Sequence, residues 1–530
     1  MNRRAFWAAA IAIVLIALLL RTARVARLDS LSGDEAQNYG IVVASESTAE
    51  MISIVRRVEG HPPLPYLLDR CVVAVGGEGA YRRRIHLVAL GTLTVALVML
   101  LALRAFGPRC ALLTGIIAAT SPYFIYSSTE FRSYSLYAVL TVLYGLALLR
   151  LLRTSDVRNA IVWGVAAAAL ALTHYFGFFL IAASGLYVLA RRDLRAIGVG
   201  ALTFLIVFGA WLPGFFEQLA DDRYTWATRS LAARNMLLPF SLPWGPTAGW
   251  ILLGCLLLGL VYVRRPARER MEFTALVITA LGGVLLAWLA HFNRGMLGAR
   301  YLVGHALLLL PAACLYWSRM GSLGDIPIGR GRRSTTRRLP ARLHGAFALG
   351  LLVWASVRAH RESEWSHAET SAMTAAARTV EIAEQSNDRV VVSPAWSMLS
   401  FCHAYRGDSP VSAPPYAQPL PWLDTVNRFA MSRDDDLIGR QVRTLAEHLE
   451  DGGRVWFVMR RDFPGDPEAK RMHENPAWAA GALHQAEYGI HFQLLDALHR
   501  HGIVVHSWET HWDEYRFPAR VLLFESRDHP

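Results

Sequence analysis

The chain has 530 residues, a formal net charge of +12, and a composition that is 53% hydrophobic and only 18% charged. Charged residues make up roughly 25% of an ordinary soluble protein, so this composition indicates an integral membrane protein. The basic residues are almost entirely arginine, with Lys470 the only lysine. In a membrane protein such a surplus usually lies in cytoplasmic loops, so membrane lipids are expected partners and nucleic acid is not. The five scattered cysteines have no metal-ligand spacing and predict neither a disulfide framework nor a structural zinc site.

Hydrophobic segments follow one another from the N-terminus to about residue 360. About 20 apolar residues cross the hydrocarbon core of a bilayer. The run from Ala5 to Leu20 resembles a signal peptide, but the many later segments favour an uncleaved first span. Those segments lie at 85–103, 110–128, 134–152, 159–175, 176–190, 196–214, 247–263, 272–290, 301–317 and 344–360. The sequence predicts a mainly α, polytopic membrane domain over 1–360 with about eleven spans.

Arginines alternate between loops as the positive-inside rule requires if the N-terminus is cytoplasmic. Arginine-rich loops lie near 104–109, 150–158, 191–195, 264–270 and 319–342, whereas loops 129–133 and 291–300 are poorer in arginine. The long first loop, about 28–84, also holds arginines, but long loops cross regardless of charge. This topology gathers polar residues at the external face: Asp34, Glu35, His61, Glu130, Arg132, His174, Arg294 and Arg300.

The character of the chain changes after the last span. Amphipathic helical stretches at 366–385, 435–453 and 478–502 alternate with β-branched runs at 389–393, 454–459, 502–508 and 519–525. This alternation predicts a C-terminal α/β domain over 361–530, which the topology places outside the membrane. No glycine-rich phosphate loop and no internal repeat is evident in it.

Two adjacent acids, Asp34 and Glu35, follow the first hydrophobic segment. Carboxylates at a membrane boundary are costly unless they do chemistry or find a partner. One interpretation is that they stabilise the first turn of a short helix beginning near Ala36. The other is that one is a general base and its neighbour a metal ligand or hydrogen-bond partner, since adjacent side chains point in different directions. The spacing alone leaves both open.

A stiff turn, His61-Pro62-Pro63, lies in the same loop as the acids, because each proline fixes its own backbone angle and restricts the residue before it. Glu130, Arg132 and Tyr134 stand where one span ends and the next begins. One interpretation is an interfacial ion pair with the tyrosines in an aromatic belt. The other is that these residues belong to a site at the external face.

Three later positions complete the external set. His174 ends another external segment and is the weakest candidate of the three. Arg294 and Arg300, the latter followed by Tyr301, are the best external cations, because an arginine suits bidentate binding of a phosphate.

Taken together and in order, these motifs resemble the GT-C membrane glycosyltransferases. They are Asp34-Glu35-Ala36 with Tyr39, His61-Pro62-Pro63-Leu64, the stretch from Tyr126 to Tyr134, and Arg300-Tyr301-Leu302. More narrowly, they are similar to the family 39 group, which includes protein mannosyltransferases and lipid A aminoarabinose transferases. Three positions depart from the pattern: Thr129, Pro65 and the Gly304-His305 pair.

The resemblance implies a sugar donor carried on a polyprenyl phosphate and an acceptor hydroxyl attacked at the external membrane face. It implies that Asp34 is the base, with Glu35 beside it, and that His61 and Arg300 lie near the donor phosphate. Arg132 is a further candidate for binding that phosphate, because a departing phosphate needs cationic partners. Glu130, Tyr134, His174 and Tyr301 are further site candidates. The acceptor (lipid, glycan or protein), the sugar and any need for a divalent metal stay open. A bacterial inner membrane is the expected location.

The chemistry of the residues supports the same reaction class independently. Displacing a phosphate from an anomeric carbon needs a base and stabilisation of an oxocarbenium-like state, which carboxylates provide in glycoside chemistry. A transporter or lipid flippase would instead place ionisable residues near the bilayer midplane. A non-catalytic scaffold that displays the C-terminal domain would leave the acids of the first loop unexplained.

Overall fold

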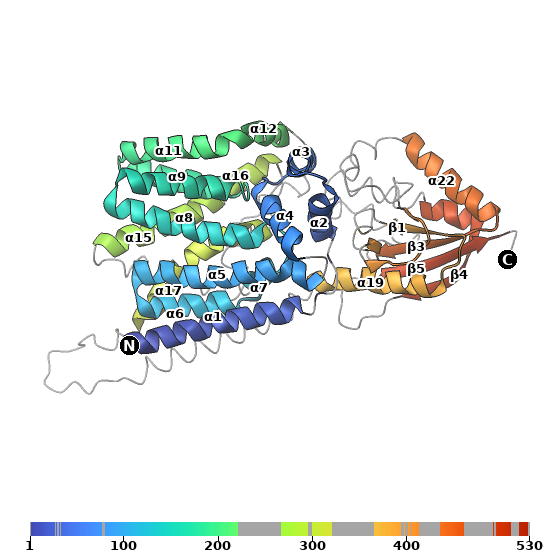
Figure 1. Cartoon of the computed structure of the whole chain (residues 1–530), viewed down its shortest axis with the longest axis horizontal. Coiled ribbons are helices and arrows are strands. Elements are labelled where there is room, and N and C mark those ends of the chain that lie inside the picture. The colour runs from blue at the N-terminus through green and yellow to red at the C-terminus, as the bar shows by residue number, and fades with distance from the viewer. Residues whose placement is uncertain are drawn as a thin grey trace.

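The structure is a computed structural model that describes residues 2–26, 28, 31, 33–76, 80–220, 267–294, 299–320, 365–393, 397, 401–402, 404–412, 435–460, 491, 494–509 and 519–527. Within these residues a bundle of apolar helices is followed by a mixed sheet (Figure 1). The sheet lies beyond the end of the bundle that carries α2, α3 and α4 (Figure 1).

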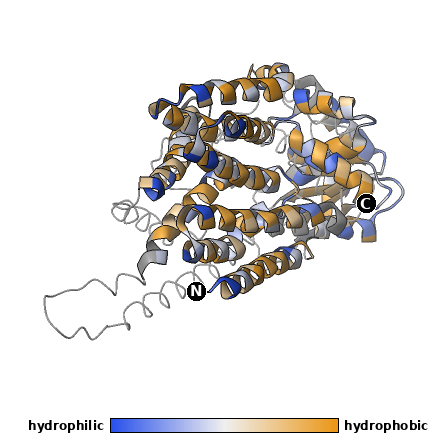
Figure 2. Ribbon diagram, turned by 60° about the vertical axis from the view of Figure 1, so that its left-hand side comes forward, coloured by the Kyte–Doolittle hydropathy of each residue, from blue (hydrophilic) through white to orange (hydrophobic). Residues whose placement is uncertain are grey.

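The bundle confirms the helical membrane fold that the sequence predicts. Among the described residues, five helical stretches are long and apolar enough to cross a membrane: Arg3–Val25, Arg84–Phe106, Tyr134–Thr154, Leu194–Ala220 and Ala267–Ala290. Shorter apolar helices occupy Pro108–Thr120, Val157–Ala171, Gly177–Ala190 and Arg300–Leu315. Hydrophobic residues run along these helices and hydrophilic ones gather towards their ends (Figure 2). The predicted segments 247–263 and 344–360, and the boundary at 360, lie outside the described residues.

The helices are labelled here with their bounds: α1 Arg3–Val25, α5 Ala80–Phe106, α6 Pro108–Thr120, α7 Pro122–Ser127, α8 Tyr134–Thr154, α9 Val157–Ala171, α10 Gly177–Ala190, α11 Leu194–Phe208, α12 Leu212–Ala220, α15 Ala267–Val277, α16 Gly283–Arg294 and α17 Val303–Met320. One difference from the sequence prediction concerns segment 110–128, which is two helices. Pro122 cannot continue α6 and begins α7, whose N-cap Ser121 accepts a hydrogen bond from the Phe124 N–H at 3.5 Å.

The first loop folds into three helices, α2 Gly33–Ala44, α3 Thr48–Val58 and α4 Leu64–Gly76. Their apolar faces share a core with α9 and the segment around Trp211, through residues such as Ile54 and Tyr66. The turn at His61-Pro62-Pro63 separates α3 from α4, as its stiffness predicts. The loop is therefore packed against the end of the bundle.

A five-stranded sheet forms the C-terminal unit, with strand order β2-β1-β3-β5-β4. The elements are α19 Trp365–Ala383, β1 Asp388–Ser393, β2 Val411–Ser412, α22 Asp435–Glu450, β3 Arg454–Arg460, β4 Gly502–Glu509 and β5 Ala519–Ser526. Strand β1 is parallel to β2 and β3, and β5 is antiparallel to β3 and β4. The four predicted β-branched runs are β1, β3, β4 and β5, and β2 is an additional short strand.

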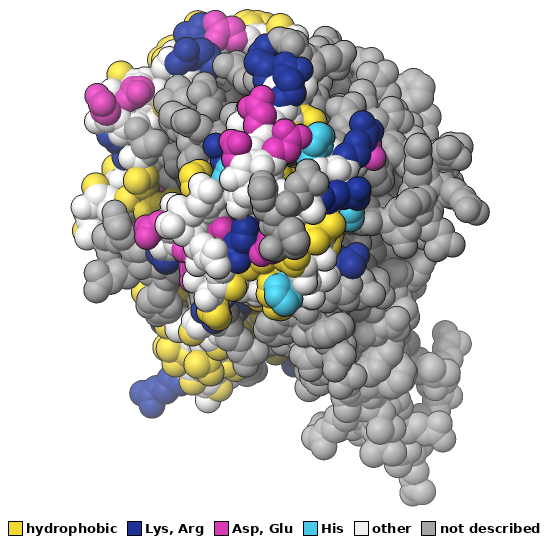
Figure 3. All heavy atoms as spheres, turned by 90° about the vertical axis from the view of Figure 1, so that its right-hand side faces the viewer, with side chains coloured by type: hydrophobic (Ala, Val, Ile, Leu, Met, Phe, Trp, Pro, Cys, Tyr) yellow, Lys and Arg dark blue, Asp and Glu magenta, His cyan; other side chains and the backbone are white. Residues whose placement is uncertain are grey.

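Side chains alternate across this sheet and give it two apolar faces. Val390 and Trp456 pack on the face that α19 covers, whereas Val391 and Phe457 pack on the face that α22 and residues 494–498 cover. The face of the molecule seen in Figure 3 carries intermixed basic and acidic side chains. The pair Arg500–Asp496 in this unit is exposed. A layered sheet with a mixed polar surface is typical of an aqueous domain.

Close packing of α9 on α11 depends on small residues, which yields a stability prediction. A Cβ at Gly200 would lie 2.7 Å from a ring carbon of Trp163, whereas a Cβ at Gly198 on the same helix meets nothing within 4 Å. We expect Gly200→Ala to destabilise the bundle by about 1–3 kcal/mol, because an extra methyl group in a well-packed interface forces shifts. Gly198→Ala is the matched control. Equal unfolding midpoints for the two variants in detergent would contradict the packing.

Candidate functional site

The polar residues predicted for the site come from segments that meet at one end of the bundle. These are the end of α1, helix α2, the turn before α4, and the connections 128–133, 172–176 and 299–302. Each connection joins the ends of apolar helices, so the polar side chains lie where helices stop rather than along them. This end is also the one that carries α2–α4 and faces the sheet (Figure 1).

A buried ion pair joins Glu35 of α2 to Arg84 of α5. The Arg84 Nη2 lies 2.9 Å from Glu35 Oε1 and 2.8 Å from Oε2, and Arg84 is 0% and Glu35 5% exposed. The Phe131 N–H donates to Glu35 Oε1 at 2.7 Å. Glu35 therefore holds three segments together, and both of its oxygens are engaged. Asp34 lies in the first turn of α2, which begins at Gly33 rather than near Ala36; its side chain lies outside the described residues.

The segment before α8 is fixed by two residues of the site. The Tyr126 hydroxyl donates to Glu130 Oε1, and the Arg132 Nη1 donates to Asn38 Oδ1 at 2.6 Å. Asn38 Oδ1 also accepts from the Tyr66 hydroxyl at 3.1 Å. Arg132 is thereby directed towards the first loop, and Glu130 towards the tyrosine one turn before it.

His61, His174 and the aromatic rings around them form what we call the histidine cluster. The His61 and His174 rings meet edge to face with centroids 5.3 Å apart, and His61 Nδ1 lies 3.3 Å from Glu59 Oε2. The other rings within 6.0 Å of His174 belong to Tyr134, Tyr137, Phe176 and Tyr301. The guanidinium of Arg300 lies over the Tyr301 ring, 5.5 Å from its centroid. The cluster therefore brings together residues that are far apart in the sequence.

The environment keeps both imidazoles neutral. Burial lowers the pKa of His61 below its usual 6.5, and the positive charges of Arg132 and Arg300 lower it further, against the opposing effect of Glu59. Burial holds the pKa of His174 well below 6.5, with His61, Arg132 and Arg300 acting in the same direction. Desolvation and nearby cations both disfavour a charged imidazole. At neutral pH these side chains act as hydrogen-bonding groups without charge.

His174 has a nitrogen that the described part of the protein does not satisfy. Its Nδ1 accepts the Phe176 N–H at 3.2 Å, so the neutral ring carries its proton on Nε2. Nε2 is buried and has no hydrogen-bond partner among the described residues, and His174 is 3% exposed. A buried donor without an acceptor is unfavourable, so it points to a ligand or a water molecule at this position.

The structure thus places the predicted residues in two adjoining groups. His61, Arg132, Tyr134, His174, Arg300 and Tyr301 belong to the histidine cluster and its cations. Glu35 and Glu130 belong to the network around α1, α2 and α5. Sequence reasoning missed Arg84, Asn38 and Glu59. A signal for Arg84 was present, because Arg82, Arg83 and Arg84 are three consecutive arginines at the predicted external end of a span. Within the described residues no group of three His, Cys, Asp or Glu side chains is placed to hold a metal ion.

Comparison with known proteins identifies the fold. The family model of dolichyl-phosphate-mannose-protein mannosyltransferases matches residues 60–213. Two structures of ArnT from Cupriavidus metallidurans, one bound to undecaprenyl phosphate and one in the apo state, are 14% and 12% identical to the chain, with TM-scores of 0.54 and 0.56. They cover 98% and 99% of this chain, and 97% and 98% of the ArnT chains. The protein has the GT-C glycosyltransferase fold.

A third GT-C structure extends this likeness. The archaeal oligosaccharyltransferase AglB from Archaeoglobus fulgidus, in complex with an inhibitory peptide and a dolichol-phosphate, is 12% identical, with a TM-score of 0.52. That match covers 98% of this chain and 74% of AglB. No curated protein sequence matches the chain. The family match on 60–213 includes His61, Arg132 and His174, and the structural matches extend the GT-C fold over nearly all of the chain.

The buried ion pair yields a stability prediction. Arg84→Met leaves the Glu35 carboxylate buried without its arginine, and breaking a buried pair costs about 3–5 kcal/mol. We expect the double variant Arg84→Met/Glu35→Gln to recover most of that loss, because no uncompensated charge remains. Unfolding midpoints in detergent measure both. Arg56→Met, which removes an exposed pair with Glu217, is the control and should change little. A single variant as stable as the double one would contradict this account.

Proposed function

We propose that the protein is an integral membrane glycosyltransferase that moves a sugar from a polyprenyl-phosphate donor to the hydroxyl of a lipid, glycan or protein acceptor. The observation that carries the proposal is the meeting of Arg132, Arg300, His61 and His174 at one end of the bundle, beside the helix that bears Asp34. Two cations and a buried N–H donor suit a phosphate group. ArnT bound to undecaprenyl phosphate and AglB bound to a dolichol-phosphate have the same fold.

The roles follow from the chemistry of the transfer. Asp34 takes the proton of the acceptor hydroxyl, and that oxygen forms a bond to the anomeric carbon of the sugar. The bond between this carbon and the phosphate oxygen breaks, and its electron pair leaves on the phosphate. Arg132, Arg300 and the Nε2–H of His174 stabilise the charge that develops there. The products are the glycosylated acceptor and polyprenyl phosphate, and the proton returns from Asp34 to solvent.

Glu35 has a different role from Asp34 in this proposal. Its two oxygens already accept hydrogen bonds from Arg84, and Oε1 accepts one from the Phe131 N–H as well. A carboxylate held by an arginine is a weak base, because its charged form is stabilised. Glu35 therefore positions α2 and the segment before α8, and Asp34 is left as the base.

The proposed orientation places this end of the bundle outside the cytoplasm. Arg104, Arg150, Arg153, Arg191 and Arg192 lie at or just beyond the opposite ends of α5, α8 and α10, as the positive-inside rule requires of the cytoplasmic side. The proposal thus includes a cytoplasmic N-terminus, a bacterial inner membrane and an external C-terminal sheet. Charged site residues at helix ends also favour a transferase over a transporter, which would need them within the bundle.

The base is tested by Asp34→Asn. We expect transfer of radiolabelled sugar from synthetic polyprenyl-phosphate sugars, assayed in nanodiscs, to fall by at least about 100-fold, the usual contribution of a general base. Donor binding should persist, because Asp34 acts on the acceptor. Glu217→Gln, which alters an exposed acid, is the control. Near-normal turnover by a folded Asp34→Asn variant would remove Asp34 from the mechanism.

The role of His174 is tested by replacing its N–H donor. A hydrogen bond to a charged group contributes about 1.5–3 kcal/mol, so His174→Phe should weaken donor binding by about 10- to 100-fold. His174→Gln keeps an N–H donor and should lose less. If a folded His174→Phe variant binds donor like the wild type, Nε2 does not contact the phosphate.

The lowered histidine pKa values also predict a direction for pH. Donor affinity should not change through these imidazoles between pH 8 and their ordinary pKa of 6.5, because both remain neutral there. Below pH 6.5 the unfolded chain binds protons that the folded state resists, so the free energy of unfolding falls with acidification. The part of this fall that comes from His174 should be absent from a folded His174→Phe variant, and an identical pH dependence of unfolding in that variant would contradict the lowered pKa of His174.

A further inference from the structure

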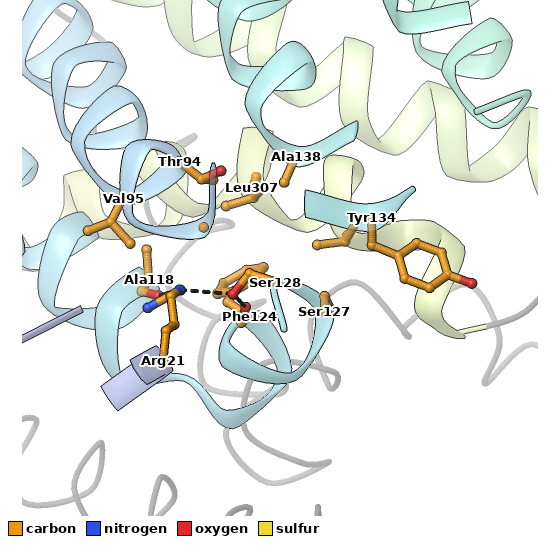
Figure 4. A pocket seen from close by; sticks show the side chains of 12 residues that line it. Arg21, Thr94, Val95, Ala118, Phe124, Ser127, Ser128, Tyr134, Ala138 and Leu307 are labelled. Carbon is orange, nitrogen blue, oxygen red and sulfur yellow. Dashed lines mark hydrogen bonds between the residues drawn. The ribbon is translucent and has the colours of Figure 1, made fainter. Parts of the chain in front are cut away.

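A further buried arginine lies in α1, outside the residues assigned to the reaction. Arg21 is 1% exposed, and its Nε donates to Ser128 Oγ at 2.8 Å. Its Nη1 and Nη2 donate to the carbonyls of Ala17, Ala119 and Ala118 at 3.2, 3.4 and 3.3 Å. Figure 4 shows the side chain reaching from α1 towards Ser128 and Ala118, across one end of a small pocket.

The charge of Arg21 is compensated by a helix end. No ion pair with a carboxylate is found for it among the described residues, and its acceptors Ala118 and Ala119 lie in the last turn of α6. Carbonyls at a helix C-terminus carry partial negative charge, which favours a cation there. A buried charge without an acid as its partner destabilises the fold. Capping of α6 does not by itself explain why an arginine lies at this position.

The bond to Ser128 gives Arg21 a second effect. Arg24, one turn further along α1, donates from Nε to Thr129 Oγ1 at 2.9 Å. Consecutive residues, Ser128 and Thr129, are thus held by two arginines on one face of α1. We call this pair of contacts the arginine clamp. Glu130, Phe131 and Arg132 follow immediately and reach the site.

Gly91 of α5 is needed for the clamp to close. A Cβ at this position would lie 2.4 Å from Ser128 Cβ, 2.6 Å from Ser128 Oγ and 2.7 Å from Arg21 Nε. Real Cβ atoms do not approach other atoms so closely, and Ser128 is itself tied to the Phe124 carbonyl at 2.7 Å. Any larger residue at 91 must therefore displace Ser128 or Arg21.

We propose that Arg21, together with Gly91 and Ser128, is a positioning element that sets where Arg132 meets the donor phosphate. The clamp holds the segment from α1, while Glu35 and Asn38 hold Phe131 and Arg132 from α2. The segment is thereby fixed from both sides. The inference rests on the proposed transfer reaction for its catalytic consequence, but the position of the segment can be measured without any turnover.

The test compares Gly91→Ala with Gly185→Ala. Gly185 lies within α10, and a Cβ there meets nothing within 4 Å, so it is a matched change in a membrane helix. In nanodiscs we expect Gly91→Ala to raise the KM for the polyprenyl-phosphate sugar at least tenfold while kcat changes less. Amide hydrogen exchange of residues 128–133 should rise in Gly91→Ala and not in Gly185→Ala. Gly185→Ala should match the wild type in both measurements.

A second variant covers the case in which Gly91→Ala does not fold. Ser128→Ala removes the acceptor of the Arg21 Nε–H without adding volume, and it should show the same rise in exchange and in KM to a smaller degree. Exchange and donor KM within twofold of the control in the folded variant would overturn the proposal. If no donor supports turnover in any variant, the proposed function fails, but the exchange measurement still decides whether the clamp positions the segment.

Discussion

The ion pair between Glu35 and Arg84 is the contact on which the rest of the site depends. It is buried, so it persists only because each charge has its partner and Glu35 also accepts the Phe131 N–H. Through it α2, α5 and the segment before α8 share one fixed point. The helix that carries Asp34 is positioned by this pair, and so is the start of the segment that carries Arg132. In the proposed function Glu35 is therefore a positioning residue, and Asp34 is the base.

At this end of the bundle, positive charge and uncharged hydrogen-bond donors are supplied by different residues. The arginines carry the positive charge of this end of the bundle, while burial and those same arginines keep His61 and His174 neutral. A neutral imidazole donates one hydrogen bond without adding to the repulsion between cations. In the proposed reaction this lets His174 bind a phosphate oxygen beside Arg132 and Arg300. Enclosure of the ring by aromatic side chains leaves Nε2 without a partner among the described residues, and this burial is also the largest cause of the lowered pKa.

Much of this organisation was predictable from the sequence, and the remainder was not for identifiable reasons. Hydropathy predicts the spans, and alternation of helix and strand patterns predicts β1, β3, β4 and β5, because both depend on local periodicity. Ordered motifs single out His61, Arg132 and Arg300, and the predicted topology adds His174; the structure brings these four residues together. The partnership of Glu35 with Arg84 could not be predicted, since 49 residues and two helices separate them. Pro122 also breaks segment 110–128, which hydropathy alone reads as continuous.

The arginine clamp explains why a buried arginine, and not an apolar residue, lies at position 21. Arg21 could be replaced by an apolar residue if its purpose were to fill space within α1, because such replacements of buried ions are often neutral or stabilising. What an apolar residue could not do is bind the last carbonyls of α6 and Ser128 together, across a gap that only glycine at 91 leaves open. Arg21 therefore lies where the ends of α1 and α6 meet the segment that carries Arg132, and these three must keep fixed relative positions. That coincidence connects the first span of the bundle to the position of Arg132.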